Sequence, residues 1–135
     1  MARILIVDDD ELFIKLMAHT LKQSGHEIEV ALDGLAGTRA FAASHFDVVI
    51  CDIFMPEQEG IETIRLFRKA RPDVGIIAIS GGLKLEKAQG MDVLQIAGML
   101  GATVTLKKPF KMSELNTAVA RLISNNSISA KEALA

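Results

Sequence analysis

Five apolar, strand-like runs alternate with stretches of helical periodicity along this 135-residue chain, and this alternation is the strongest constraint on its fold. The strand-like runs cover residues 3–7, 27–31, 46–51, 75–79 and 103–106. Strands that alternate with helices predict βαβ units and therefore a parallel sheet. Near-continuous apolar runs such as Val48-Val49-Ile50 predict strands that are covered on both faces.

Five such units predict an α/β fold, a doubly wound three-layer sandwich. Two strand orders are possible, and the flavodoxin-like order 2-1-3-4-5 requires only five strands. Apolar residues at helical spacing place helices between residue 10 and Gly25, over 35–44, from Gly60 to Arg71, over 90–100, and from an N-cap at Ser113. The expected domain covers residues 1–123, and the small and polar residues 124–135 are expected to form a loose tail or a helix extension.

Length and charge exclude several classes of protein. A chain of 135 residues suits one domain, and a net charge of −2 argues against a nucleic-acid surface, which needs clustered Lys and Arg. No apolar stretch reaches about 18 residues, so no membrane span is expected, and no secretory signal precedes the first strand pattern. The single cysteine, Cys51, is expected to be a buried small hydrophobic residue, and it fits a cytoplasmic location.

Four of the five strand-like runs end in a chemically reactive residue. Asp8-Asp9 follow the first run, Asp52 the third, Ser80 the fourth and Lys108 the fifth. Because the carboxyl ends of parallel strands meet at one edge of a sheet, we expect these side chains to share one crevice. In the 2-1-3-4-5 order, the unreactive second strand lies at the far edge and Asp8-Asp9 lie beside Asp52.

This set of side chains suits phosphoryl transfer. Three neighbouring carboxylates raise one another's pKa unless a cation neutralises them, and hard oxygen ligands of this kind suit Mg²⁺. Asp52, at the centre, can act as a nucleophile toward a phosphoryl group. Lys108 can offset further negative charge, and Ser80 can donate a hydrogen bond. The three histidines fall in helices or loops, so none is placed as a general base.

The motifs at these strand ends resemble the receiver domain of two-component response regulators over residues 3–123. They are Val7-Asp8-Asp9, Asp52-x-x-Met55-Pro56-x-x-x-Gly60, Ser80-Gly81 and Lys108-Pro109-Phe110. The ordered set is specific although each motif alone is weak. The resemblance implies a stand-alone receiver domain in a phosphorelay, with no output domain after residue 123.

The resemblance also implies the roles of the acidic residues. Asp52 would be the phosphoacceptor. Asp9 would bind Mg²⁺ (or Mn²⁺) directly, and Asp8 would hold it mostly through water. The backbone carbonyl of Phe54 would be a further metal ligand.

The remaining implied features concern the response to phosphorylation. Ser80 would move toward the phosphoryl group, Lys108 would pair with it, and the peptide bond before Pro109 would be cis. The donor would be a sensor histidine kinase or a histidine phosphotransfer protein. The signal would leave through the helix over 90–100, the strand over 103–106 and the last helix to a protein target, or through a homodimer. No enzymatic activity beyond self-phosphotransfer and autodephosphorylation is implied, and no nucleic acid or membrane is involved.

Three features depart from the family pattern. Thr105 stands where many receivers carry an aromatic residue that turns inward on activation. Phe54 stands where polar residues are common in fast-hydrolysing members, so we expect slow autodephosphorylation. The segment after Ser80 is longer than usual, and Gly81-Gly82 predict a mobile flap. The apolar helix expected over 90–100 either packs further into the core or offers a partner surface.

Three alternatives compete with the receiver interpretation. A binding module that works without phosphorylation would not need the complete acidic set. A phosphohydrolase with an aspartyl intermediate usually has a second acid two residues after the nucleophile, where this chain has Phe54. A flavin-binding electron carrier needs a phosphate-binding loop after the first strand, where this chain is acidic.

Overall fold

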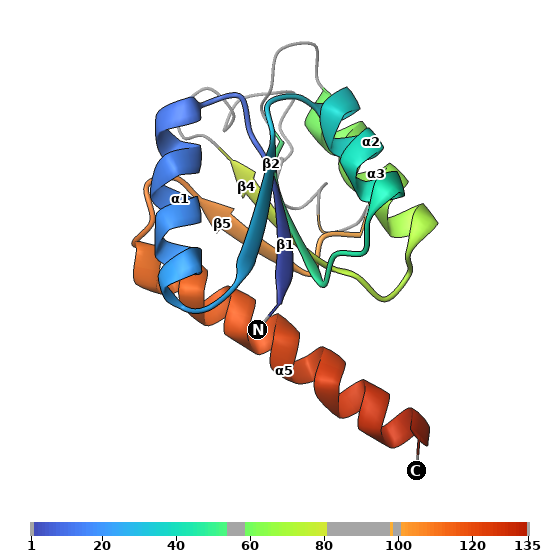
Figure 1. Ribbon diagram of the computed structural model, residues 1–135. Coiled ribbons are helices and arrows are strands. Elements are labelled where there is room, and N and C mark those ends of the chain that lie inside the picture. The colour runs from blue at the N-terminus through green and yellow to red at the C-terminus, as the bar shows by residue number, and fades with distance from the viewer. Residues whose placement is uncertain (1, 54–58, 81–97, 99–100, 135) are drawn as a thin grey trace.

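A five-stranded parallel sheet forms the centre of the protein (Figure 1). The computed structural model describes residues 2–53, 59–80, 98 and 101–134, with side chains as far as residue 124. The strand order is β2-β1-β3-β4-β5, which confirms the predicted topology and places β2 at an edge. The strands are β1 (Arg3–Val7), β2 (Glu27–Ala31), β3 (Val48–Asp52), β4 (Gly75–Ser80) and β5 (Val104–Lys107).

Helices cover both faces of this sheet (Figure 1). They are α1 (Glu11–Gln23), α2 (Gly34–Ala43), α3 (Glu59–Ala70) and α5 (Met112–Leu134). Helices α1 and α5 pack together on one face, and α2 and α3 pack together on the other. The helix expected over 90–100 and the flap expected after Ser80 lie outside the described residues, apart from Gly98.

Successive side chains along the central strands point to opposite faces of the sheet, so the core has two layers. Side chains of β1, β3 and β4 that face α2 and α3 pack around three aromatic rings, those of Phe41, Phe46 and Phe67. The alternate side chains face α1 and α5 and pack on Met17, Leu21, Leu115, Val119 and Leu122. Every residue of β3 and β4 is buried, because both of their faces are covered.

Local signals explain where α1 begins and ends. Asp10 is the N-cap, and its carboxylate accepts a hydrogen bond of 3.1 Å from the Phe13 backbone N–H. Ser24 is the C-cap, and Gly25 follows with φ of 91°, a conformation that glycine adopts without a steric cost. The predicted end of this helix at Gly25 is confirmed.

The start of α5 differs from the prediction. Ser113 lies inside the first turn and is not the N-cap. The Lys111 carbonyl already accepts hydrogen bonds from the Glu114 and Leu115 backbone N–H groups, so the helix begins before Ser113. At its other end α5 continues to Leu134, so residues 124–134 extend the helix past the sheet (Figure 1).

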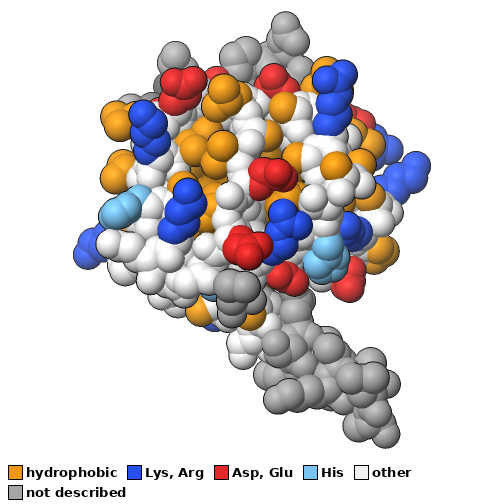
Figure 2. Space-filling view, in the orientation of Figure 1, with side chains coloured by type: hydrophobic (Ala, Val, Ile, Leu, Met, Phe, Trp, Pro, Cys, Tyr) orange, Lys and Arg blue, Asp and Glu red, His pale blue; other side chains and the backbone are white. Residues whose placement is uncertain are grey.

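Exposed hydrophobic side chains gather over α1 and the β2 edge (Figure 2). Leu12 and Leu16 lie on the outer side of α1, and Val30 lies on β2. Within the described ranges, no helix has the length and apolar character that crossing a membrane requires.

Candidate functional site

The sheet brings the predicted reactive residues to one edge. Val7 of β1 is in register with Cys51 of β3, so Asp8 and Asp52 follow side by side. Ser80 ends β4 and is in register with Lys107 of β5. The Lys108 backbone N–H donates a hydrogen bond of 2.8 Å to the Ser80 carbonyl, which continues the strand pairing into the site.

Three carboxylates form an acidic cluster at this edge. Asp8, Asp9 and Asp52 each offer an oxygen, and these oxygens lie within 4.8 Å of one another. Asp8 and Asp52 are buried, while Asp9 is exposed. The Asp10 backbone N–H donates to Asp8 Oδ1 at 2.9 Å. Asp8 Oδ2 is buried and has no hydrogen-bond partner among the described residues, so it suits a cation that brings its own positive charge.

Lys108 supplies the positive charge next to this cluster. Its Nζ lies 3.6 Å from Asp8 Oδ2 and 3.6 Å from Asp52 Oδ2. Burial raises the pKa of the Asp8 carboxyl, while the hydrogen bond from the Asp10 N–H and the Lys108 charge act in the opposite direction. One ammonium does not neutralise three carboxylates, so the cluster favours a further cation.

The Phe13 ring borders the same lysine and in turn contacts a second ring, that of Phe110. Lys108 Nζ lies 4.2 Å from the centroid of the Phe13 ring. Phe13 makes an edge-to-face contact with Phe110, with ring centroids 5.5 Å apart and an interplanar angle of 82°. The Lys108-Pro109 peptide bond is cis, as expected. The contact of Phe13 with Lys108 could not be predicted from the sequence, because the helical spacing of Phe13 is that of an ordinary core residue and the contact is tertiary.

Gly60 belongs to the site through its backbone. A Cβ there would overlap the Asp52 carbonyl oxygen and the Ile53 backbone, so only glycine lets α3 pack this closely on the end of β3. Ser80 is buried at the end of the neighbouring strand. The proposed ligand at Phe54, and the Met55-Pro56 and Gly81 positions, lie outside the described residues.

Cys51 lies next to the acidic cluster and is buried, as expected. Its thiol donates weakly to the Asp52 carbonyl at 3.5 Å. Burial raises the pKa of the Cys51 thiol, and the Asp52 charge adds to that effect, so the group stays neutral.

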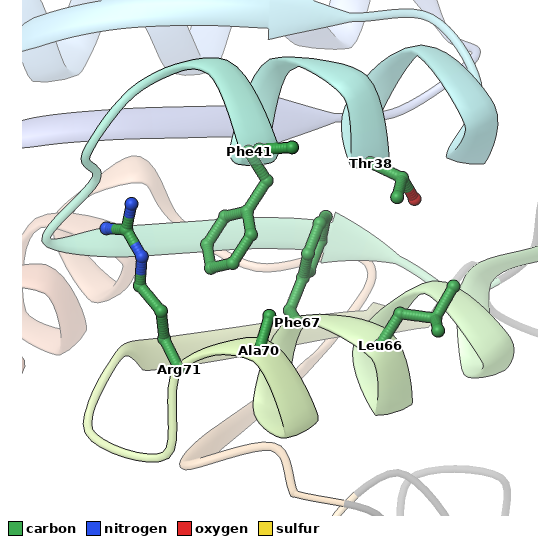
Figure 3. A pocket seen from close by; sticks show the side chains of 7 residues that line it. Thr38, Phe41, Leu66, Phe67, Ala70 and Arg71 are labelled. Carbon is green, nitrogen blue, oxygen red and sulfur yellow. The ribbon is translucent and has the colours of Figure 1, made fainter.

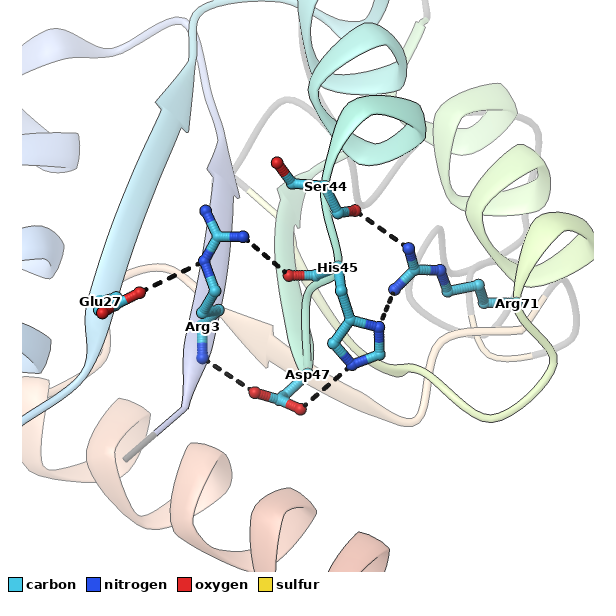
Figure 4. Close-up of polar contacts among 6 residues, drawn as sticks. All are labelled: Arg3, Glu27, Ser44, His45, Asp47 and Arg71. Atoms are coloured by element: carbon cyan, nitrogen blue, oxygen red, sulfur yellow. Dashed lines mark hydrogen bonds and ion pairs between the residues drawn. The ribbon is translucent and has the colours of Figure 1, made fainter.

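His45 lies at the opposite, amino end of the strands (Figure 4). Its Nε2 is 3.6 Å from Asp47 Oδ1, and its Nδ1 is 2.6 Å from Arg71 Nη1. Because a guanidinium only donates hydrogen bonds, Nδ1 acts as the acceptor. The contacts of this histidine are therefore structural and remote from Asp52.

A groove of about 200 Å³ lies between α2 and α3, away from the carboxylates. Phe41, Leu66 and Phe67 line it, and Arg71 stands at one end (Figure 3). The Arg71 guanidinium already donates to the Ser44 carbonyl at 3.0 Å and lies 5.0 Å from the Phe41 centroid. Most of the side chains that line this groove are apolar and none is a carboxylate, so the acidic chemistry belongs to the strand ends.

Comparison with known proteins gives the same assignment. The family model of the response regulator receiver domain matches residues 4–120. The chain is 32% identical over 126 residues to the DNA-binding transcriptional regulator NtrC of Azospirillum brasilense, covering 93% of this chain and 25% of that protein. The chain spans between a quarter and about half of the length of the first curated relatives it matches.

Solved structures agree with the family model. A CheY-like response regulator receiver domain protein from Methanospirillum hungatei has a TM-score of 0.85 at 26% identity, covering 96% of this chain and 98% of that one. The response regulator TrrA of Thermotoga maritima, solved in complex with Mg²⁺ and BeF, has a TM-score of 0.76 at 30% identity, covering 90% of this chain and 99% of that one. With its five-stranded fold and an acidic cluster at the carboxyl ends of the strands, the chain belongs to the response regulator receiver domain family.

Proposed function

We propose that Asp52 accepts a phosphoryl group and that Asp8, Asp9, Asp52 and the Phe54 carbonyl hold the Mg²⁺ (or Mn²⁺) that assists the transfer. The observation that carries the proposal is the buried Asp52 carboxylate, which shares a cluster with two further carboxylates and lies 3.6 Å from Lys108 Nζ. Burying charge of this kind costs folding free energy, so the presence of these carboxylates at one site indicates a functional role.

The chain's own residues have separate parts in the transfer. An Asp52 oxygen forms the new P–O bond while the P–N bond of a phosphohistidine donor breaks and its electron pair returns to the imidazole ring. Mg²⁺, when bound, neutralises negative charge on the phosphoryl oxygens and the carboxylates. Lys108 pairs with the transferred group, and the Ser80 hydroxyl donates a hydrogen bond to it.

Receiver domains interact with histidine kinases or phosphotransfer proteins, and one of these would be the donor here. The output surface we propose comprises the helix expected over 90–100, β5 and α5. A groove of about 280 Å³ between β5 and α5 supports it, because Val104, Leu106 and Ala118 give this groove apolar walls. Either a protein target or a second copy of the chain would cover this face.

We further propose that this domain itself binds no nucleic acid or membrane and acts in the cytoplasm without catalysing turnover of a separate substrate. The net charge of −2 and the free thiol of Cys51 support this assignment. DNA binding appears in the name of the NtrC relative, of which this chain matches 25%.

Phosphotransfer profiling tests the acceptor. Wild type and Asp52→Asn are incubated with radiolabelled phosphohistidine donors and Mg²⁺, and with acetyl phosphate. We expect label on the wild type, none on Asp52→Asn, and normal labelling of Asp73→Asn, which alters an exposed carboxylate outside the cluster. Equal labelling of wild type and Asp52→Asn would reject Asp52 as the acceptor. A folded wild type that takes no label from any donor would favour a module that works without phosphorylation.

A further inference from the structure

Phe13 and Lys108 come from different elements and meet beside the acidic cluster. Phe13 lies in the first turns of α1, and Lys108 follows β5. The Lys108 ammonium lies 4.2 Å from the Phe13 centroid, well inside the range of a cation–π interaction. The Lys108 side chain is only 22% exposed, so water screens this attraction weakly.

We propose that Phe13 is a positioning residue for Lys108, which it holds away from the carboxylates so that they remain available to the metal. This inference rests on the proposed function, in which Lys108 and the metal act on the same phosphoryl group. The ammonium lies 3.6 Å from both Asp8 Oδ2 and Asp52 Oδ2, beyond the usual length of an N–H···O bond. The Phe13 ring, with its centroid 4.2 Å from the ammonium, gives the charge a further partner besides the two carboxylates.

The position of the ring is itself well determined. The Phe13 backbone N–H donates to the Asp10 carboxylate at 3.1 Å, and the Asp10 N–H donates to Asp8 Oδ1 at 2.9 Å. Phe110 contacts the ring edge-to-face, and both rings pack against the core layer under α1 and α5. The turn that orients Asp8 therefore also places the ring that holds Lys108.

Without the ring, the ammonium would close on the two carboxylates and compete with Mg²⁺. For Phe13→Leu we expect the Mg²⁺ dissociation constant to rise about three- to tenfold, the range that an exchange of one cation–π contact allows. Phe13→Tyr keeps an aromatic face and should bind Mg²⁺ as the wild type does. In the Lys108→Met background, Phe13→Leu should leave Mg²⁺ binding unchanged, because the competing charge is gone.

The test is an Mg²⁺ titration of these four variants and the wild type, followed by amide NMR because the chain contains no Trp or Tyr. Leu16→Ala serves as the control, since it removes a half-exposed apolar side chain from the same helix. Thermal unfolding checks that each variant is folded. The inference would be overturned if Phe13→Leu bound Mg²⁺ as tightly as the wild type. It would also be overturned if Phe13→Leu weakened Mg²⁺ binding by the same factor in the presence of Lys108 and in the Lys108→Met background.

The outcome separates this inference from the proposed function. If the wild type binds Mg²⁺ with the expected Phe13–Lys108 coupling but never takes label at Asp52, the phosphoacceptor proposal fails and the positioning role stands. If the wild type is labelled at Asp52 and the coupling is absent, the positioning role alone fails. A wild type that binds no Mg²⁺ would overturn both.

Discussion

Lys108 Nζ lies at the same distance, 3.6 Å, from Asp8 Oδ2 and from Asp52 Oδ2. The lysine therefore belongs to neither carboxylate alone and offsets part of the negative charge of both. Asp8 remains the less well compensated of the two in one respect, because its Oδ2 accepts no hydrogen bond from the described residues. The metal-free cluster thus keeps buried negative charge that binding of a cation would relieve.

Asp8→Asn tests this account of the buried charge. Burial raises the pKa of Asp8 in the folded protein, so its contribution to stability is fully present below the unfolded pKa and is lost as pH rises through the folded one. At neutral pH the neutral amide should therefore stabilise the metal-free protein, because it removes the charge of a buried carboxylate. Urea unfolding at neutral pH measures the change.

The same variant should lose the response to metal. Mg²⁺ is expected to raise the midpoint of unfolding of the wild type and to leave that of Asp8→Asn nearly unchanged. A wild-type stability that does not respond to Mg²⁺, or a metal-free Asp8→Asn less stable than the wild type, would contradict this account.

The placement of the strand-end carboxylates can be predicted from the sequence, because that information is periodic and local. Asp8-Asp9 and Asp52 each follow a buried strand, and the carboxyl ends of parallel strands meet at one edge of the sheet. That rule is enough to place these carboxylates together, and the observed order β2-β1-β3-β4-β5 agrees with it. The cis bond before Pro109 and the edge position of β2 follow from the resemblance and from the strand order.

Tertiary contacts could not be predicted in the same way. Phe13 fits the apolar stripe of α1 equally well with or without Lys108 above it, so its spacing carries no sign of the contact. Ser113 looks like an N-cap by residue type, yet the Lys111 carbonyl accepts the first helical hydrogen bond. Thr105 is exposed on the edge strand β5. The alternation of apolar and polar residues along a strand does not say what a threonine does in place of an aromatic ring.

Phe54→Asn tests the predicted slow loss of the phosphoryl group. A bulky apolar ring two residues after Asp52 would limit the access of water to the phosphoaspartate, and an amide would admit and orient it. We expect dephosphorylation to become severalfold faster, measured as the decay of label after removal of the donor. The control is Val30→Asn, an apolar-to-amide change at an exposed position on β2, which should lose its label at the wild-type rate. An unchanged rate for Phe54→Asn would reject the shielding role.

His26 makes the fold sensitive to acid. Its Nδ1 accepts a hydrogen bond of 3.1 Å from the Ala2 backbone N–H, so the ring is neutral in the folded protein. Burial lowers its pKa from the ordinary value of 6.5, so its contribution to stability is complete above that value and is lost as pH falls through the lower, folded pKa. Thermal melts followed by circular dichroism above and below this pH should show that the melting temperature of the wild type falls on acidification, and that it falls less for His26→Gln. Parallel declines would contradict the assignment.

Gly60→Ala should weaken the junction between β3 and α3, which holds Asp52 in place. The added Cβ would lie 2.7 Å from the Ile53 carbonyl carbon and would overlap the Asp52 carbonyl oxygen, and both are backbone atoms that cannot rotate away. Overpacking of this kind costs about 1 to 3 kcal/mol of unfolding free energy, measurable by urea denaturation.

Gly98→Ala is the matched control for this substitution. An added Cβ at Gly98 would meet no atom of the described residues within 4 Å, and Gly98 is helical and exposed, so alanine should be neutral or stabilising by up to about 1 kcal/mol. If Gly60→Ala is as stable as the wild type, α3 does not rest on the end of β3 as described. If Gly60→Ala is destabilised but still accepts the normal amount of phosphoryl label when folded, the close contact supports the fold and not the orientation of Asp52.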